Sequence, residues 1–184
     1  MPSASEATSS LPATRRHRRI IDVHLLLLDG DRCLLSLRRN TGYADGLWHV
    51  PSGHLEADEH AAAGAAREAA EELAVTVDVA DLTLAHLIDH RGAATDPPRL
   101  GIFYTATRWT GTPVNAEPDK CGGVAWFPVS DPPADTVGYH AAALAHINAG
   151  RAHSAYGWPP DGGPGPAPAP RSPSERSPGE RRGG

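Results

Sequence analysis

Apolar residues along the chain follow two different rhythms. Short runs rich in Leu, Ile, Val and aromatic residues, bounded by Gly, Pro or Asp, predict strands because such residues favour extended backbone. These runs lie at 20–28, 32–37, 47–51, 82–89, 100–107 and 124–128. From 60 to 73, Ala and Leu recur instead at three- and four-residue intervals, which predicts a helix. A weaker pattern of this kind covers 138–148 and stops at Gly150, so the chain alternates strands with helices.

The first predicted helix carries a narrow stripe of small side chains. The stripe consists of Ala62, Ala65, Ala66, Ala69 and Leu73. Small side chains permit close approach, so this face is expected to lie tightly against a sheet. Just upstream, residues 48–56 read as a strand that enters a tight Pro/Gly turn. Strand, turn and helix are therefore expected to form one unit.

Three carboxylates share one turn of the same helix. Glu68, Glu71 and Glu72 stand at positions i, i+3 and i+4, where like charges repel one another. An oxygen-only cluster of this kind suits a hard divalent cation, Mg²⁺ or Mn²⁺, which completes its shell with water and substrate phosphates. Arg67 can pair with Glu59 or Glu72 and so fix a carboxylate in one orientation. The alternative is an ordinary solvated Glu/Arg helix face.

A fixed spacing favours the metal-binding interpretation. The chain has a glycine, five residues, a glutamate, seven residues, Arg-Glu, two residues and Glu-Glu, at Gly53, Glu59, Arg67, Glu68, Glu71 and Glu72. With each residue type near ~6% of average usage, chance would give this match on the order of once in 10⁵ such chains. The pattern resembles the signature of the Nudix hydrolase family, and the resemblance covers roughly residues 19–151.

Two positions depart from the family's pattern. Ala74 stands where the family has a glycine, and if the backbone there is left-handed the substitution costs about 1 kcal/mol. Ala69 fills a slot that is usually occupied by a larger aliphatic residue, which implies closer packing or a lost methyl group or two. Neither departure alters an expected ligand.

The resemblance implies a fold and a reaction. The fold would be the Nudix α/β/α sandwich, with a mixed β-sheet between helices. The reaction would be hydrolysis of a nucleoside diphosphate linked to another group, by attack of water at phosphorus with one to three divalent ions. Implied metal ligands are the Gly53 carbonyl, Glu68, Glu71, Glu72 and Glu117. The expected catalytic residues are Glu68 as first choice of base, Glu71, Arg67 and Glu117, and the expected supporting residues of the signature are Glu59 and Glu56.

Glu117 belongs to a second short motif. It lies in Asn-Ala-Glu-Pro-Asp-Lys, residues 115–120, which looks like the family members that hydrolyse nucleoside triphosphates. A loop charge before a proline turn is the plainer alternative. Members that act on ADP-ribose or diadenosine polyphosphates carry Pro or Tyr about sixteen residues after the signature, where this chain has Arg91 and Gly92.

By elimination, the favoured reaction converts a nucleoside or deoxynucleoside triphosphate to monophosphate and pyrophosphate. The alternatives are a pyrophosphatase for ADP-ribose, a nucleotide sugar or a prenyl diphosphate, and a nucleotide-sensing module without catalysis. Expected substrate-binding residues are Arg38 and Arg39 for phosphates, and Trp48, His49 and Phe103 for the base. His24, His86, His90 and His140 show no ligand spacing and are expected to be incidental.

Composition bounds the remaining questions. With 184 residues, 40% hydrophobic and 21% charged, we expect a leader at 1–18, one domain at 19–151 and a Pro/Gly-rich disordered tail at 152–184. Residues 156–158 could form a short docking segment. The net charge of −5 and the lack of a membrane-length apolar run disfavour nucleic-acid and membrane partners. Two cysteines without zinc spacing or a disulfide framework fit a reducing cytoplasm. The protein is expected to be a monomer or a homodimer.

Overall fold

The computed structural model describes residues 18–92 and 96–158. Almost all of the expected leader, and the tail from residue 159 onward, lie outside the described residues. The elements in chain order are β1 (Ile20–Asp29), β2 (Arg32–Arg38), β3 (Trp48–His49), β4 (Ser52–His54), α1 (Ala61–Leu73), the short 3₁₀ helix η1 (Val79–Asp81), β5 (Thr83–His90), β6 (Arg99–Ala106), β7 (Cys121–Pro128), α2 (Gly138–Asn148) and β8 (His153–Tyr156).

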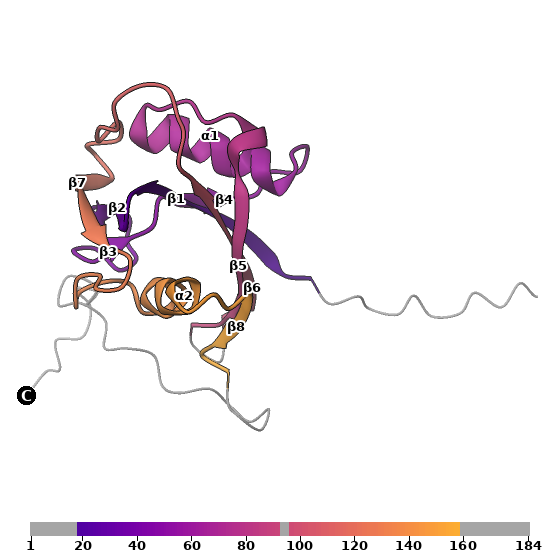
Figure 1. Cartoon of the computed structure of the whole chain (residues 1–184). Coiled ribbons are helices and arrows are strands. Elements are labelled where there is room, and N and C mark those ends of the chain that lie inside the picture. The colour runs from indigo at the N-terminus through magenta and orange to yellow at the C-terminus, as the bar shows by residue number, and fades with distance from the viewer. Residues whose placement is uncertain (1–17, 93–95, 159–184) are drawn as a thin grey trace, which may run out of the picture.

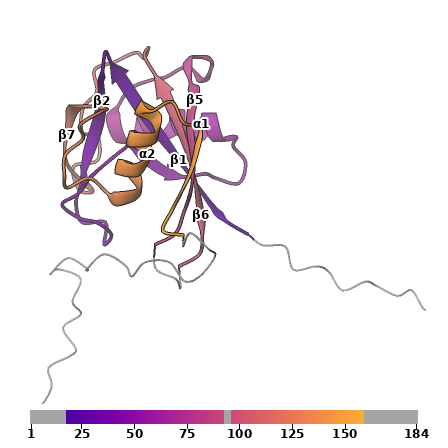
Figure 2. The same ribbon diagram turned by 60° about the horizontal axis from the view of Figure 1, so that its bottom comes forward.

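The strands form one mixed sheet, with α1 on one face and α2 on the other (Figure 1). Its order is β3-β2-β1-β6-β5-β8, while β4 pairs with β1 and β7 pairs with β2. The pairs β1–β6 and β5–β8 are parallel, and the others are antiparallel. This is the expected α/β/α sandwich, and the view from the α2 side shows the same layering (Figure 2).

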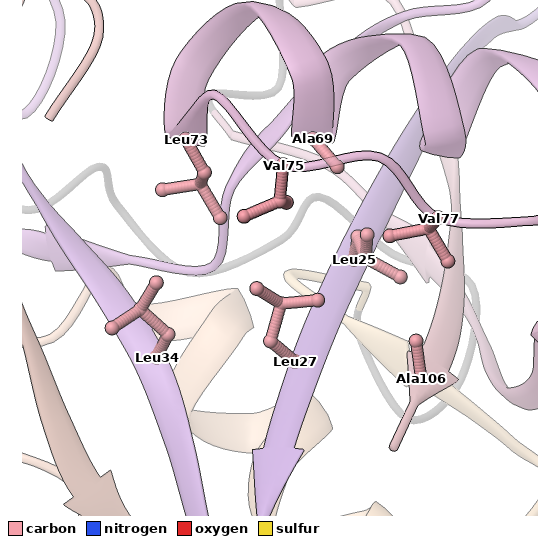
Figure 3. Close-up of a cluster of buried hydrophobic side chains, with 8 residues drawn as sticks. All are labelled: Leu25, Leu27, Leu34, Ala69, Leu73, Val75, Val77 and Ala106. Carbon is pink, nitrogen blue, oxygen red and sulfur yellow. The ribbon is translucent and has the colours of Figure 1, made fainter. Parts of the chain in front are cut away.

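Strand β1 explains why its apolar run is continuous. Leu25 and Leu27 pack toward α1, whereas Leu26 packs toward α2, because successive side chains of a strand point to opposite faces. A strand covered on both faces has no polar face. The cluster beneath α1, drawn in Figure 3, contains Leu25, Leu27, Leu34, Ala69, Leu73, Val75, Val77 and Ala106.

Helix α1 begins and ends with specific caps. His60 is the N-cap, and its ring nitrogen accepts a hydrogen bond from the Ala63 N–H at 3.3 Å. At the other end Ala74 is left-handed, with φ 56° and ψ 32°, in the position where the family has glycine. Ala69 is fully buried against the sheet, so the small-residue stripe does bring the helix close to the strands.

Two expected boundaries need correction. The segment expected as one strand at 47–51 contains only the two-residue strand β3, which pairs with β2, whereas β4 follows at 52–54 and joins β1 instead. The domain also continues beyond residue 151, since β8 pairs with β5 and the Trp158 indole N–H donates to the Asp89 carbonyl at 3.1 Å. The segment at 156–158 therefore docks on the sheet edge, and the expected tail starts too early.

None of the helices in the described part of the chain has both the length and the apolar character needed to cross a membrane.

Candidate active site

A cleft of about 390 Å³ opens where α1, β4 and the turn before β7 meet. Its lining brings together segments that are far apart in sequence, including the segment between β6 and β7 that runs past α1 in Figure 1. The lining residues are Ser36, Arg38, Thr41, His49, Ser52, Gly53, His54, Glu56, Arg67, Glu68, Glu71, Glu72, Glu117, Lys120 and Cys121. All five residues expected to bind metal are among them.

Gly53 lies directly beside the Glu68 carboxylate. A Cβ atom built on Gly53 would collide with that carboxylate in the position it has here. A larger residue at 53 would therefore displace the end of the Glu68 side chain, which gives the glycine of the signature a steric role in placing this carboxylate.

Arg67 links the glutamate of the loop before α1 to two glutamates of the helix itself. Its Nε and Nη2 donate to the two carboxylate oxygens of Glu59 at 3.1 and 2.8 Å, so its partner is Glu59 rather than Glu72. Its Nη1 donates to Glu68 at 2.7 Å and to Glu71 at 3.2 Å. Glu59 also accepts from the Glu56 N–H at 2.9 Å. Hydrogen bonding to the Arg67 guanidinium lowers the pKa of the Glu59 carboxyl to about 2, so the Arg67–Glu59 ion pair stays charged at neutral pH.

The carboxylates of α1 repel one another in a partly desolvated setting. Burial raises the pKa of Glu68, although Arg67 opposes the shift. Burial raises the pKa of Glu72 to about 8, and the neighbouring charges of Glu68 and Glu117 add to the effect. The Glu72 carboxylate accepts one backbone hydrogen bond, from the Ser52 N–H at 3.2 Å. A carboxylate in this state gains most from a nearby cation.

Glu117 reaches the cleft because its turn is tied to α1 and to itself. The Ala116 N–H donates to the Glu72 carbonyl at 3.0 Å, which anchors the turn on the helix end. Asn115 accepts from the Glu117 N–H at 3.2 Å and donates to the Cys121 carbonyl at 2.8 Å. The Glu117 carboxylate then pairs with the Lys120 ammonium at 2.7 Å.

The expected substrate-binding residues are divided between the cleft and the core. Arg38 lines the cleft, and its guanidinium donates to the Tyr43 carbonyl at 2.8 Å and to the Thr41 hydroxyl at 3.0 Å. His49 also lines the cleft and is largely buried. Arg39 is exposed and lies outside the cleft lining; its backbone N–H donates to the Lys120 carbonyl at 2.8 Å.

Two aromatic residues lie elsewhere than expected. Trp48 precedes His49 on β3, so it points to the other side and packs edge-on against Phe127 at 4.9 Å between ring centroids. Phe103 has 0% exposure and belongs to the core cluster on the α2 side. Its ring has no open face, so the expectation that Phe103 stacks on a nucleobase is wrong for this structure.

The donor set of the cleft fits a divalent cation. It consists of the carboxylates of Glu68, Glu71, Glu72 and Glu117 with the Gly53 carbonyl, and hard cations prefer oxygen donors of this kind. Within residues 18–92 and 96–158, no three His, Cys, Asp or Glu side chains already stand in coordination geometry. Arg67 and Lys120 instead pair with Glu68 and Glu117, so these basic groups hold oxygens that a cation would use.

Sequence reasoning missed a group of buried histidines behind the cleft. His24 stacks on Phe103 at 4.1 Å between ring centroids and lies edge-on to His140 at 4.9 Å. His49 is 5.9 Å from His140, and His90 stacks on Tyr139 at 4.0 Å. These residues come from β1, β3, β5 and α2, so only the three-dimensional fold unites them. Neither nitrogen of His24 has a hydrogen-bond partner among the described residues.

Lys120, Thr41 and Ser36 also line the cleft, although none of them was expected as a site residue. Ser36 and Thr41 carry no distinctive spacing. For Lys120 a signal does exist, because it is the only lysine in the chain.

The comparisons with known proteins agree with this geometry. A family model described as NUDIX domain matches residues 17–147. The solved structure of a MutT NUDIX hydrolase from Burkholderia pseudomallei is 26% identical, with a TM-score of 0.63, over 70% of this chain and 97% of that one. A mutator MutT protein from Bacillus halodurans is 18% identical, with a TM-score of 0.59, over 79% and 94% of the respective chains, which shows a shared fold. A search of curated proteins found no match.

The mixed sheet between two helices and the cleft lined by carboxylates fit a hydrolase of the phosphoanhydride-cleaving kind, the class to which the matching family model assigns this chain. The chain belongs to the Nudix hydrolase family, whose members act on nucleoside diphosphates linked to another group and generally use divalent cations.

Proposed function

We propose that the protein hydrolyses a nucleoside or deoxynucleoside triphosphate to a nucleoside monophosphate and pyrophosphate, with Mg²⁺ or Mn²⁺. The observation that carries the proposal is the meeting of Glu117 with Glu68, Glu71 and Glu72 in one cleft beside Gly53. Four carboxylates that repel one another in one cleft suit a cation that also binds phosphate oxygens.

The chain's own residues divide the work as follows. A bound divalent cation would neutralise phosphate charge and favour attack by water. Glu68 would accept the proton of the attacking water, directly or as a ligand, and Glu71, Glu72, Glu117 and the Gly53 carbonyl would complete the ligand set. Arg67 would orient Glu68, with which it shares a 2.7 Å hydrogen bond. Positioning of this kind supplies most of the catalysis in phosphoryl transfer.

A polyphosphate would be held by the basic side of the cleft. The Arg38 guanidinium lines the cleft and is held on the loop after β2 by Tyr43 and Thr41, and such a planar group can contact two phosphate oxygens at once. The Asn115–Lys120 motif, together with Arg91 and Gly92 after β5, favours triphosphates over ADP-ribose and dinucleotides. We also infer action on free nucleotides rather than nucleic acid, in the cytoplasm, as a monomer or homodimer.

The test is a substrate panel with chromatographic identification of products. Nucleoside triphosphates, ADP-ribose, a nucleotide sugar and a prenyl diphosphate are each incubated with Mg²⁺, with Mn²⁺ and with chelator. We expect metal-dependent release of monophosphate and pyrophosphate from a triphosphate. Faster cleavage of ADP-ribose, the sugar or the prenyl diphosphate would replace the triphosphate by that substrate. Tight nucleotide binding with no cleavage of any compound would make the protein a sensor.

A further inference from the structure

Lys120 differs in kind from every other strong base in the protein. The sequence contains 16 arginines and this single lysine. A guanidinium is planar and forms several directed hydrogen bonds at once, whereas an ammonium is a compact charge on a flexible four-carbon stem. The only ammonium side chain in the sequence lines the cleft that holds the carboxylates.

The backbone at Lys120 is fixed while its side chain is open. The Lys120 N–H donates to the Glu117 carbonyl at 3.0 Å, and the Lys120 carbonyl accepts from the Arg39 N–H at 2.8 Å. Asn40 adds a side-chain hydrogen bond to the Asp119 carbonyl at 3.1 Å. The side chain of Lys120 is nevertheless 64% exposed. Its ammonium can therefore move within the cleft without any change in the turn.

The three basic residues of the cleft are held very differently. Arg67 donates to Glu59, Glu68, Glu71 and the His54 carbonyl. Arg38 donates to a carbonyl and a hydroxyl. Among the described residues, the Lys120 ammonium has one partner, the Glu117 carboxylate at 2.7 Å. An exposed pair of this kind is weak, so Lys120 is the cation that can most readily exchange its partner.

We propose that Lys120 is a mobile counter-charge that passes from Glu117 to a phosphate oxygen when a polyphosphate enters with its divalent cation. Without ligand, the ammonium neutralises Glu117. With ligand, Glu117 turns to the cation and Lys120 binds the phosphoanhydride chain. This inference rests on the proposed function. It makes Lys120 a substrate-binding residue that also competes with the cation for Glu117, so that cation and polyphosphate each strengthen the binding of the other.

The test measures two affinities by titration calorimetry, for Mn²⁺ alone and for inorganic pyrophosphate at saturating Mn²⁺. In Lys120→Met we expect Mn²⁺ alone to bind about 2- to 5-fold more tightly, because an exposed competing ion pair has been removed. Pyrophosphate should bind about 10-fold or more weakly, because a charge-assisted hydrogen bond has been lost. Lys120→Arg should recover part of the pyrophosphate affinity.

Arg108→Met is the matched control, because it removes an equal charge from an exposed ion pair with Asp81 outside the cleft lining. Both of its affinities should equal those of the wild type. Unchanged affinities in Lys120→Met would overturn the proposal. So would weaker binding of both Mn²⁺ and pyrophosphate, because Lys120 would then only shape the site.

A spectroscopic readout does not depend on turnover. Reductive ¹³C-methylation labels one side chain in this protein besides the amino terminus, so the Lys120 resonance can be assigned directly. We expect it to shift when Mg²⁺ and pyrophosphate are added together, and an unmoved resonance would contradict the exchange. The two proposals can fail independently. The movement of Lys120 can be observed even if the substrate panel identifies another diphosphate as the substrate. Conversely, a Lys120 that stays on Glu117 would not contradict metal-dependent hydrolysis.

Discussion

The cleft gathers glutamates from α1 and from the turn before β7, whereas the buried histidines behind it come from three strands and α2, and of these only His49 also lines the cleft. Three of the glutamates pair with a basic side chain, Glu68 and Glu71 with Arg67 and Glu117 with Lys120. The histidines are buried among aromatic rings, and His24 has no hydrogen-bond partner among the described residues. The glutamates form a charged group that a cation would stabilise, although burial raises the pKa of Glu72 to about 8, whereas burial keeps His24 and His49 in a neutral group.

This difference follows from the chemistry of the two groups. A carboxylate has an unperturbed pKa near ~4, so removing its charge at neutral pH requires strong desolvation. Imidazole titrates near ~6.5, so burial suffices to make it neutral. Burial lowers the pKa of His24 to about 3 and, with the nearby Arg38 charge, that of His49 to about 3. Burial therefore lets His24 and His49 be packed near one another without charge repulsion.

The largest expected effect follows from removing one carboxylate charge from the glutamates of the cleft. Glu71→Gln and Glu72→Gln should each lower turnover about 100-fold or more, because each removes the charge of one proposed metal ligand, which should cost several kcal/mol of transition-state stabilisation. The fold should be retained, since the substitution is isosteric and relieves repulsion. Steady-state rates with Mg²⁺, beside circular dichroism, measure both effects. Asp31→Asn, in the exposed β1–β2 turn, is the charge-matched control. Rates close to wild type in both glutamate variants would eliminate the proposed site.

The second prediction concerns the neutral group and the pH dependence of stability. The folded protein keeps His24 neutral, whereas in the unfolded chain it gains a proton near pH ~6.5. The stability is therefore complete above that pH and falls as the pH drops toward the folded pKa of about 3. At pH 5 the loss for His24 alone is about 2 kcal/mol.

Urea unfolding between pH 7.5 and pH 5 measures this loss. His24→Leu should flatten the slope over this interval, even if the variant is less stable at pH 7.5. The same slope in wild type and variant would mean that His24 is charged in the folded protein or that other groups set the pH dependence.

A third, smaller effect tests how far the charged group extends. Glu117→Gln should lower turnover about 10-fold, which is less than the effect of the α1 variants. Glu117 lies on a turn, and its charge is already partly neutralised by the ion pair with Lys120. The measurement is kcat with Mg²⁺ for the best substrate of the panel. An unchanged kcat would return Glu117 to an ordinary loop charge.

The charged group was easier to predict from the sequence than the neutral one. Glu68, Glu71 and Glu72 lie within one helical turn, so their spacing alone places them together. Glu117 was found only through its short motif, because hydrogen bonds between its turn and the end of α1 bring it to the cleft. The histidines come from four elements, and strand pairing decides their neighbours. Spacing along the chain contains no such information.

The same distinction explains the errors in the fold. Strands with long apolar runs, such as β1, were located within a residue or two. Strand β8 was missed because its four residues are mostly exposed and show no apolar alternation; of the four, only Ser154 is buried. Phe103 was placed at the substrate because its strand was expected beside the cleft, but its side chain faces α2. The side of the sheet to which a residue points depends on register, which the sequence pattern left open.

The smallest expected effect concerns backbone strain beside the cleft, which should change the stability of the protein but not its turnover. Ala74 holds a left-handed conformation at the end of α1, only two residues after Glu72. Ala74→Gly should raise the free energy of unfolding by about 1 kcal/mol, because glycine adopts this conformation without a steric cost. Thermal and urea unfolding measure the gain, and turnover should stay within about 2-fold of wild type, since 1 kcal/mol of fold stability adds nothing to the cation site. A loss of stability would show that other contacts of the Ala74 methyl outweigh the strain. A large change in turnover would show that the backbone at the end of α1 sets the position of the Glu72 carboxylate.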